Sequence, residues 1–297
     1  MTDITLLDGG MGQELVHRSG DKPTNLWATR VMLDHPGMVQ AIHTDYFNAG
    51  ATVATTNTYA IHHDRLVKDG LDDQLVTLHK SALAEAKAAR AAHGSGRIAG
   101  SIGPLVASYR PDTHPPHDEA VGKYAEVAQL LAPEVDLILC ETVASLAHAR
   151  AVLEGALTAG KPVWLSVTVD DEDGTKLRSG EPVADLCAIA AKGAAAVLAN
   201  CSAPEAMSDA LQALAKCGLP YGAYANGFER ITKEFLQDRP TVDALSPRRD
   251  LGPEAYARYA LGWVAQGATI VGGCCEVGPA HIAELARALV AAGHRIV

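Results

Sequence analysis

The sequence predicts an eight-stranded (β/α)8 TIM barrel, an α/β fold, that forms a single domain over residues 1–297. Short apolar runs alternate eight times with amphipathic stretches of helical spacing, which is the order of elements in that fold. The runs are apolar at nearly every position, as expected for parallel strands that are covered on both faces. A chain of 297 residues is also within the range in which α/β barrels form one domain.

The predicted strands are rich in Val, Ile, Leu and Ala and are shorter than typical helices. They cover residues 4–9, 51–58, 97–103, 135–142, 162–169, 194–201, 220–226 and 268–274. Between them, helical spacing of apolar residues predicts helices over 37–48, 71–92, 118–131, 145–158, 182–192, 204–216, 253–266 and 279–292. Four of these helices begin at a proline, and glycines that we expect to end helices follow six of them: Gly50, Gly160, Gly193, Gly218, Gly267 and Gly293.

A doubly wound open sheet is the main competing fold. The turn after the first strand, Asp8-Gly9-Gly10-Met11-Gly12, is rich in glycine but lacks the G-x-G-x-x-G spacing of a dinucleotide-binding loop. Long segments at residues 10–36, 104–117 and 227–252 follow the first, third and seventh strands. In a barrel these three segments belong to the catalytic face.

The charge balance of the chain bears on its partners. Lys and Arg number 25 against 35 Asp and Glu, giving a net charge of −10, which argues against a nucleic-acid partner. The first residues lack a basic segment followed by a long apolar one, and no apolar run reaches about 18 residues. We therefore expect a cytoplasmic protein without a membrane partner, and the sequence leaves open whether it forms a homo-oligomer.

Six cysteines are too few for a disulfide scaffold in a chain of this length. Cys187 and Cys217 lie in or at the end of Ala-rich helices, and we interpret both as small buried hydrophobic residues. Cys140 precedes Glu141 in one strand, so the two side chains are expected to point to opposite faces. If Glu141 faces a site, Cys140 packs beneath a helix.

The other three cysteines, Cys201, Cys274 and Cys275, end two of the predicted strands. Three thiolates can hold one zinc ion, and three protein ligands with an open position are typical of a catalytic zinc site. Gly272 and Gly273 precede the adjacent pair and allow the close backbone approach that would turn both thiols inward. The sequence therefore predicts a catalytic metal site at the carboxyl ends of the strands.

Polar residues also gather at the carboxyl ends of the predicted strands, which in a barrel converge on one mouth. They are Asp8, Thr56, Asn57, Glu141, Thr142, Asn200, Tyr224 and Asn226. A single polar residue at a strand end is often only a loop cap. Their recurrence on strand after strand predicts a site in that mouth.

Five segments together resemble the homocysteine S-methyltransferase family, in the same order and at similar spacing over nearly the whole chain. They are Leu7-Asp8-Gly9-Gly10-Met11-Gly12-Gln13-Glu14-Leu15, Ala54-Thr55-Thr56-Asn57-Thr58-Tyr59, Ile138-Leu139-Cys140-Glu141-Thr142, Asn200-Cys201-Ser202 and Gly272-Gly273-Cys274-Cys275. Asn-Cys followed about seventy residues later by Gly-Gly-Cys-Cys is the most specific part of this pattern. The resemblance implies a (β/α)8 barrel, Zn²⁺ held by Cys201, Cys274 and Cys275, and methyl transfer to the thiol of L-homocysteine to form methionine.

The resemblance also implies which residues contact the substrates. Glu141 would bind the homocysteine ammonium group and Asp8 would help to orient it, which suits an anion beside a cation. Trp27 lies in a context similar to that of a Trp in members that act on S-methylmethionine, so we expect it to contact the methyl donor. The complete set of expected substrate contacts is Asp8, Gly9, Trp27, Thr56, Glu141, Asn200 and Asn226.

The chemistry of thiol alkylation fits a site of this kind. The thiolate is the nucleophile, and coordination to a metal deprotonates a thiol outright. A cationic donor such as S-methylmethionine, S-adenosylmethionine or betaine would favour aromatic walls, for which Trp27, Tyr59, Tyr109 and Tyr224 are candidates. Phe228 and the loop at residues 108–117 depart from the family pattern, so the donor is less strongly indicated than the acceptor.

Three functions remain after the sequence is considered. The first is a zinc-dependent methyltransferase that uses S-methylmethionine or S-adenosylmethionine and homocysteine. The second is a related enzyme that uses betaine or another donor, or accepts a different thiol or a selenol. The third is a barrel that binds zinc and thiols without turnover.

Overall fold

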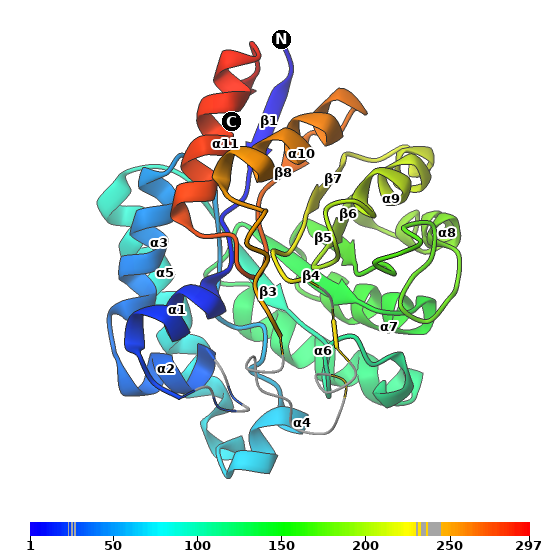
Figure 1. Cartoon of the computed structure of the whole chain (residues 1–297). Coiled ribbons are helices and arrows are strands. Elements are labelled where there is room, and N and C mark those ends of the chain that lie inside the picture. The colour runs from blue at the N-terminus through cyan, green and yellow to red at the C-terminus, as the bar shows by residue number, and fades with distance from the viewer. Residues whose placement is uncertain (23, 25, 27, 230, 233–235, 237–244) are drawn as a thin grey trace.

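The computed structural model describes residues 1–297 except 23, 25, 27, 230, 233–235 and 237–244. Its parallel strands curl into a barrel with helices on the outside (Figure 1). The strands are β1 (Asp3–Leu6), β2 (Val53–Thr55), β3 (Arg97–Ile102), β4 (Leu137–Val143), β5 (Val163–Val167), β6 (Ala194–Asn200), β7 (Tyr221–Tyr224), β8 (Ile270–Val271) and β9 (Arg295–Ile296). All eight predicted strands are present, and each contains fewer residues than the sequence indicated.

Hydrogen bonds between β1 and β2 close the barrel. The strand order runs from β2 through β8 to β1, with β9 beyond it. Leu7 forms a parallel bridge with Val53, and the Asp8 amide donates to the Val53 carbonyl at 3.2 Å. The first and second strands are therefore neighbours, as a (β/α)8 barrel requires, and the single-domain barrel fold is confirmed.

Helices form the outer layer and bury their apolar faces against the strands. Those predicted from the sequence are α3 (Met38–Asn48), α5 (Leu75–His93), α6 (His117–Leu131), α7 (Leu146–Leu157), α8 (Leu186–Ala190), α9 (Met207–Leu214), α10 (Pro253–Ala265) and α11 (Pro279–Ala291). A second apolar cluster fills the barrel interior, with residues such as Val53, Leu139, Leu198 and Ile270. The six glycines expected to end helices all adopt positive φ angles.

The segments between strands contain elements that the sequence did not predict. Residues 10–36 include α1 (Met11–Ser19) and α2 (Ala28–Asp34), and a short helix, α4 (His63–Leu66), follows β2. Met11 and Leu15 are buried one helical turn apart in α1. The last strand, β9, pairs with β1 in parallel.

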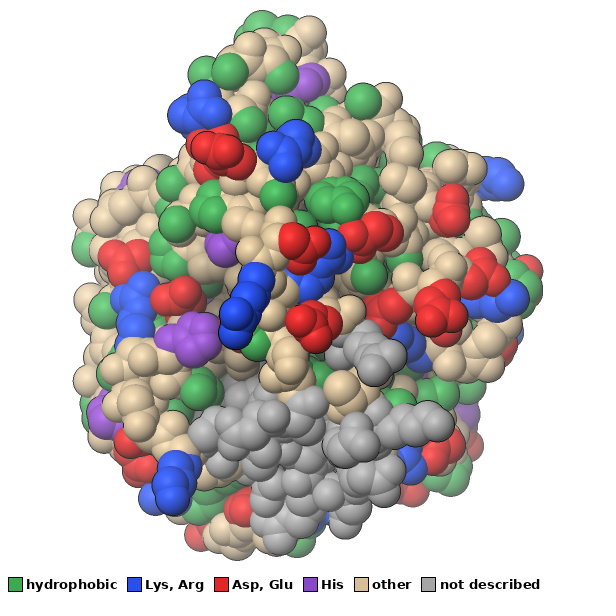
Figure 2. Space-filling view, in the orientation of Figure 1, with side chains coloured by type: hydrophobic (Ala, Val, Ile, Leu, Met, Phe, Trp, Pro, Cys, Tyr) green, Lys and Arg blue, Asp and Glu red, His purple; other side chains and the backbone are tan. Residues whose placement is uncertain are grey.

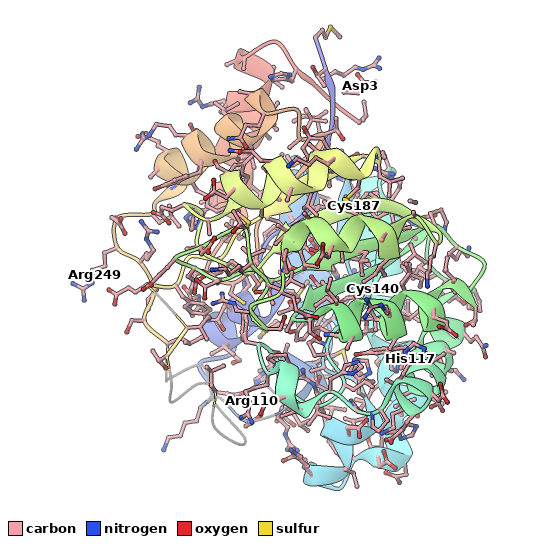
Figure 3. All side chains as sticks on the ribbon, turned by 90° about the vertical axis from the view of Figure 1, so that its right-hand side faces the viewer. Asp3, Arg110, His117, Cys140, Cys187 and Arg249 are labelled. Atoms are coloured by element: carbon pink, nitrogen blue, oxygen red, sulfur yellow. A yellow bond between two sulfur atoms is a disulfide. The ribbon has the colours of Figure 1, made fainter. Side chains whose placement is uncertain are left out.

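The prediction for Cys187 and Cys217 was wrong. The two side chains are half-buried and form a disulfide that joins α8 to the turn after α9. Their Cα atoms lie 4.6 Å apart, although 30 residues separate them in the sequence. Cys140, in contrast, is fully buried in the cluster between strands and helices, as predicted. Figure 3 shows Cys187 on α8, and it shows Arg110 and Asp3 at opposite ends of the barrel.

The face seen in Figure 2 carries interspersed acidic and basic side chains. They do not form one large patch of a single sign on the described part of that face. Within the described residues, no helix combines the length and apolar character that crossing a membrane requires.

Candidate active site

A cavity opens at the carboxyl ends of the barrel strands. It is open to the solvent, and the ≈ 940 Å³ of space between its walls includes solvent at the mouth. Its wall includes the expected residues Asp8, Gly9, Thr56, Glu141, Cys201, Cys274 and Cys275, together with Met11, Thr29, Tyr59, Ser108, Tyr109, Tyr224, Phe228 and Leu245. The strand ends therefore converge on one site, as the sequence indicated.

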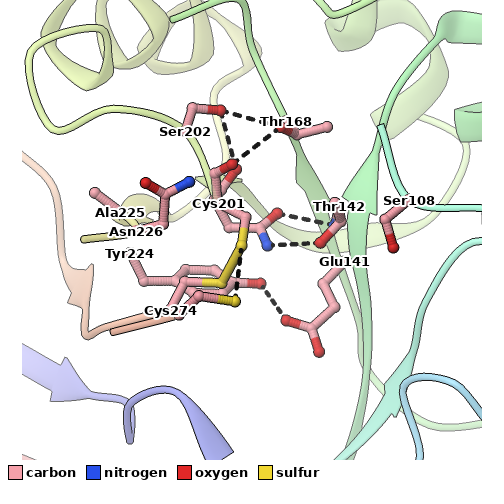
Figure 4. Close-up of a disulfide and its surroundings, with 12 residues drawn as sticks. Ser108, Glu141, Thr142, Thr168, Cys201, Ser202, Tyr224, Ala225, Asn226 and Cys274 are labelled. Carbon is pink, nitrogen blue, oxygen red and sulfur yellow. Dashed lines mark hydrogen bonds between the residues drawn. A yellow bond between two sulfur atoms is a disulfide. The ribbon is translucent and has the colours of Figure 1, made fainter. Parts of the chain in front are cut away.

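The three cysteines form a compact cluster on one side of this cavity. Their Sγ atoms all lie within 4.8 Å of one another. Cys201 and Cys274 are joined as a disulfide, and Cys275 Sγ lies 3.8 Å from Cys201 Sγ (Figure 4). The cluster predicted from the sequence is present, but two of its thiols are oxidised rather than free.

Local backbone structure brings the cysteines together. Cys201 has a φ of 51°, a left-handed conformation that turns the chain at the end of β6, and its amide donates to the Tyr224 carbonyl. Gly272 and Gly273 let β8 approach the first strand closely. A Cβ at Gly272 would lie 2.4 Å from the Leu7 Cβ, and a Cβ at Gly273 would contact the Val277 side chain at 2.1 Å. The two glycines are therefore required by close packing.

The cysteine cluster suits a soft metal ion once the disulfide is reduced. Thiolate ligands select Zn²⁺ over hard cations such as Mg²⁺ and Ca²⁺, which prefer oxygen ligands. Burial raises the pKa of the Cys275 thiol to about 12, and Glu276 and Glu141 add to this effect. A cation bound beside the three sulfur atoms would offset that cost of ionisation. Three protein ligands would leave a further coordination position facing the cavity.

Glu141 is held by two hydroxyl groups. Ser101 Oγ donates to its Oε1 at 2.5 Å, and the Tyr224 hydroxyl donates to its Oε2 at 3.1 Å. Burial raises the pKa of Glu141, while both hydrogen bonds act in the opposite direction. Figure 4 shows the carboxylate beside Tyr224 and close to the cysteine cluster. This arrangement fixes a buried carboxylate that can accept a hydrogen bond from a cation.

Asp8 is the second buried carboxylate of the cavity. Its oxygens accept hydrogen bonds from the Thr55 amide at 2.7 Å and the Thr55 hydroxyl at 2.8 Å. Burial raises the pKa of Asp8 to about 7, and the charge of Glu141 adds to the rise. His43 Nδ1 lies 4.0 Å from Asp8, but burial lowers the pKa of His43 to about 3, so its ring is neutral. The cavity therefore has two carboxylates and a strong preference for a cation.

Two of the expected substrate contacts, Asn200 and Asn226, are not among the residues that line the cavity. The Asn200 amide group accepts from the Thr142 amide at 2.9 Å and from Ser166 Oγ at 2.8 Å, and it donates to Thr142 Oγ1. Asn226 is buried, and its Oδ1 accepts from the Phe228 amide. In this structure the Asn200 amide group joins neighbouring strand ends, and the Asn226 oxygen holds the turn that leads to Phe228. Their contact with substrate stays a prediction.

The remaining expected contacts have different positions. Gly9 and Thr56 line the cavity, although the Thr56 hydroxyl is already paired with Thr58 at 2.7 Å. Trp27 lies outside the described residues. Ser101 and Thr55 hold the two carboxylates but were not identified from the sequence, because an isolated Ser or Thr in a strand carries no distinguishing signal.

Comparisons with known proteins agree with this site. The model of a family described as homocysteine S-methyltransferase matches residues 5–289. The homocysteine S-methyltransferase of Escherichia coli is 33% identical, with 95% of this chain and 94% of the relative covered. A selenocysteine methyltransferase of Astragalus bisulcatus is 26% identical, with 92% and 89% covered.

Solved structures give the same result. The metallated form of the homocysteine methyltransferase MmuM from Escherichia coli superimposes with a TM-score of 0.80 at 29% identity, covering 96% of each chain. The oxidized form of the same protein has a TM-score of 0.77 at 29% identity, with 95% of this chain and 94% of that chain covered.

Proposed function

The chain belongs to the homocysteine S-methyltransferase family, and from that premise we propose that it moves a methyl group from a sulfonium donor to homocysteine with the help of zinc. S-methylmethionine and S-adenosylmethionine are the donors we favour. One observation carries the proposal: three sulfur atoms within 4.8 Å of one another share a cavity with two buried carboxylates. Cys201, Cys274 and Cys275 would hold the metal in their reduced form.

Each part of the site has a chemical task in this proposal. Zinc, when bound, supplies the positive charge that ionises an acceptor thiol. Glu141 and Asp8 bind the ammonium group of homocysteine, and the hydroxyls of Ser101, Tyr224 and Thr55 keep those carboxylates in place. Because the ammonium stabilises the ionised carboxyl groups, binding lowers the pKa of Asp8 from its raised value.

The transfer itself is a displacement at the methyl carbon. The acceptor sulfur donates an electron pair to that carbon, the bond from the carbon to the donor sulfur breaks, and the pair in that bond remains on the donor. A sulfonium donor leaves as a neutral thioether, so no general acid is needed. The chain's contribution is to align the three atoms and exclude water. Tyr59, Tyr109 and Phe228 provide aromatic wall for the cationic donor.

A selenol acceptor is a second candidate within the same chemistry. Relatives at 26% and 24% identity are a selenocysteine methyltransferase and a selenocysteine Se-methyltransferase. Betaine as the donor has no comparable observation in its favour. Membership of a methyltransferase family also removes the reason to consider a barrel that binds zinc and thiols without turnover.

The test is product detection by mass spectrometry with reduced, zinc-loaded protein. Homocysteine and selenocysteine are each paired with S-methylmethionine, S-adenosylmethionine and betaine. We expect methionine from homocysteine and at least one sulfonium donor. Product with betaine alone would contradict the donor proposal, and product from selenocysteine alone would contradict the acceptor proposal.

A further inference from the structure

One cation beside the cavity has no anionic partner. Arg65 in α4 donates from Nε and Nη2 to the Pro104 carbonyl at 3.0 and 2.8 Å, and from Nη2 to Ser108 Oγ at 3.3 Å. Its Cζ atom lies 5.5 Å from the centre of the Tyr59 ring. Across the described ranges of the chain, no carboxylate forms an ion pair with this guanidinium, and the neighbouring Asp64 pairs with Lys123 instead.

The charge of Arg65 is costly where it lies. Burial lowers its pKa, because desolvation penalises the charged form. A guanidinium nevertheless stays protonated in proteins. Its partners in the chain are neutral oxygens and an aromatic ring, so the charge is only partly compensated. An anion in the adjoining cavity would compensate it further.

Ser108 and Tyr59 connect Arg65 to the cavity. Both residues line the cavity, and their oxygens are 2.7 Å apart. The Tyr59 hydroxyl also hydrogen-bonds the Thr142 hydroxyl, whose oxygen accepts from Asn200. The hydroxyl groups of Ser108, Tyr59 and Thr142 carry three protons, and the two hydrogen bonds between them use two of these. Because Arg65 can only donate, it uses none of these protons. One hydroxyl proton therefore remains for an acceptor in the cavity, and the guanidinium behind it makes that donor stronger.

The cavity thus has groups for both ends of a zwitterion. Asp8 and Glu141 suit an ammonium group, and the pair of hydroxyls backed by Arg65 suits a carboxylate. We propose that Ser108 and Tyr59, polarised by Arg65, bind the α-carboxylate of an amino-acid substrate. Ser108 and Tyr59 contact the ligand, and Arg65 is a positioning residue that acts through them. This inference rests on the proposed methyl transfer between amino acids.

Two substrates could supply this carboxylate, since homocysteine and S-methylmethionine both carry one. The test uses each substrate and its decarboxylated analogue, 3-aminopropanethiol for homocysteine and (3-aminopropyl)dimethylsulfonium for S-methylmethionine. The variants are Ser108→Ala and Arg65→Gln. Arg90→Gln is the matched control, because Arg90 is a half-buried arginine that pairs with Asp136 on the outer surface. Thermal melts establish that each variant is folded, and Ser108→Ala preserves the bonds from Arg65 to Pro104.

We expect both variants to raise KM for one intact substrate by about 10- to 100-fold, the range for a lost hydrogen bond to a charged group. The rise identifies which carboxylate is bound. Kinetic constants for the matching decarboxylated analogue should be the same in the wild type and the variants. The control should behave as the wild type with all four compounds.

Equal losses for intact and decarboxylated substrates would overturn the inference, as would unchanged KM values for both intact substrates. Wild-type protein that makes no methionine would instead contradict the proposed function. In that case calorimetric binding of homocysteine and 3-aminopropanethiol to the same variants decides the question. If the wild type binds homocysteine more tightly than 3-aminopropanethiol and both variants lose this difference, the carboxylate site is supported. If the difference in affinity is the same in the variants, the carboxylate site is refuted.

Discussion

Replacing Asp8 with Asn should make the protein's stability less sensitive to a rise in pH and impair its activity. Asp8 is 2% exposed, and burial raises its pKa to about 7 from an ordinary value of 3.8. Between these two values the folded protein keeps a proton that the unfolded chain has lost. The contribution of the Asp8 carboxyl to the free energy of unfolding is therefore fully present below its pKa in the unfolded chain, and it is lost as the pH rises through the folded-state pKa of about 7.

The size of the effect follows from the shift. Well below pH 7 the wild type loses about 1.36 kcal/mol for each pH unit from this carboxyl alone, and the loss from pH 5.5 to pH 8 amounts to about 2 kcal/mol. Above pH 7 the loss levels off. The Asp8→Asn variant lacks this titration, and its amide oxygen can still accept from Thr55. Its stability relative to the wild type should therefore rise by about 2 kcal/mol between pH 5.5 and pH 8.

Urea unfolding of both proteins at the two pH values, without substrate, measures this difference. The same substitution should lower kcat/KM for homocysteine by about 10- to 100-fold, because a charged partner of the ammonium is lost. Asp45→Asn, at a half-exposed carboxylate on α3, is the control for removing a negative charge. A stability difference between the wild type and Asp8→Asn that is the same at both pH values would refute the reasoning.

Three further substitutions test other parts of the structure. Tyr224→Phe removes the hydrogen bond to Glu141 and should reduce kcat/KM for homocysteine by about tenfold. Tyr221→Phe, at the start of the same strand, is the control and should leave kcat/KM unchanged. Equal effects of the two substitutions would contradict the role of Tyr224. Gly273→Ala should reduce zinc content and thermal stability, because the added methyl group collides with the Val277 side chain; a variant with normal metal content and melting temperature would contradict this packing. Cys187→Ser should lower the free energy of unfolding by about 2 to 4 kcal/mol in oxidised protein, and a reductant should abolish the difference.

The barrel could be predicted because its signal repeats along the chain. Eight apolar strands alternate with amphipathic helices, and each strand end could then be assigned to the same mouth. The helix α1 was missed because it is a short element that follows two glycines, within a segment interpreted as a loop. The disulfide between Cys187 and Cys217 was missed because only the packing of α8 against the turn after α9 brings the two residues together.

Some residues of the site could be predicted from the sequence and others could not. The cysteine cluster, Asp8 and Glu141 followed from residue type and strand position. Asn200 was expected to contact substrate as one of the polar residues at the strand ends. Its amide joins β4, β5 and β6, a structural role that the sequence did not indicate. Arg65 could not be identified, because its position behind Ser108 depends on the loop after β3.

The oxidised pair Cys201 and Cys274 makes the redox state part of any assay. Metal binding by three thiolates requires that this disulfide be reduced first. Zinc loading should therefore fail without a reductant and proceed with one. Cys140, buried away from the cavity, offers a matched control, since Cys140→Ser should leave zinc content unchanged if the variant folds.

The most direct test of the central claim combines metal analysis with product detection. Reduced wild-type protein should bind about one zinc per chain through Cys201, Cys274 and Cys275, and it should form methionine from homocysteine and S-methylmethionine or S-adenosylmethionine. Cys275→Ser should lose zinc and methionine formation together. Full methionine formation by a folded Cys275→Ser variant that holds no zinc would contradict the account.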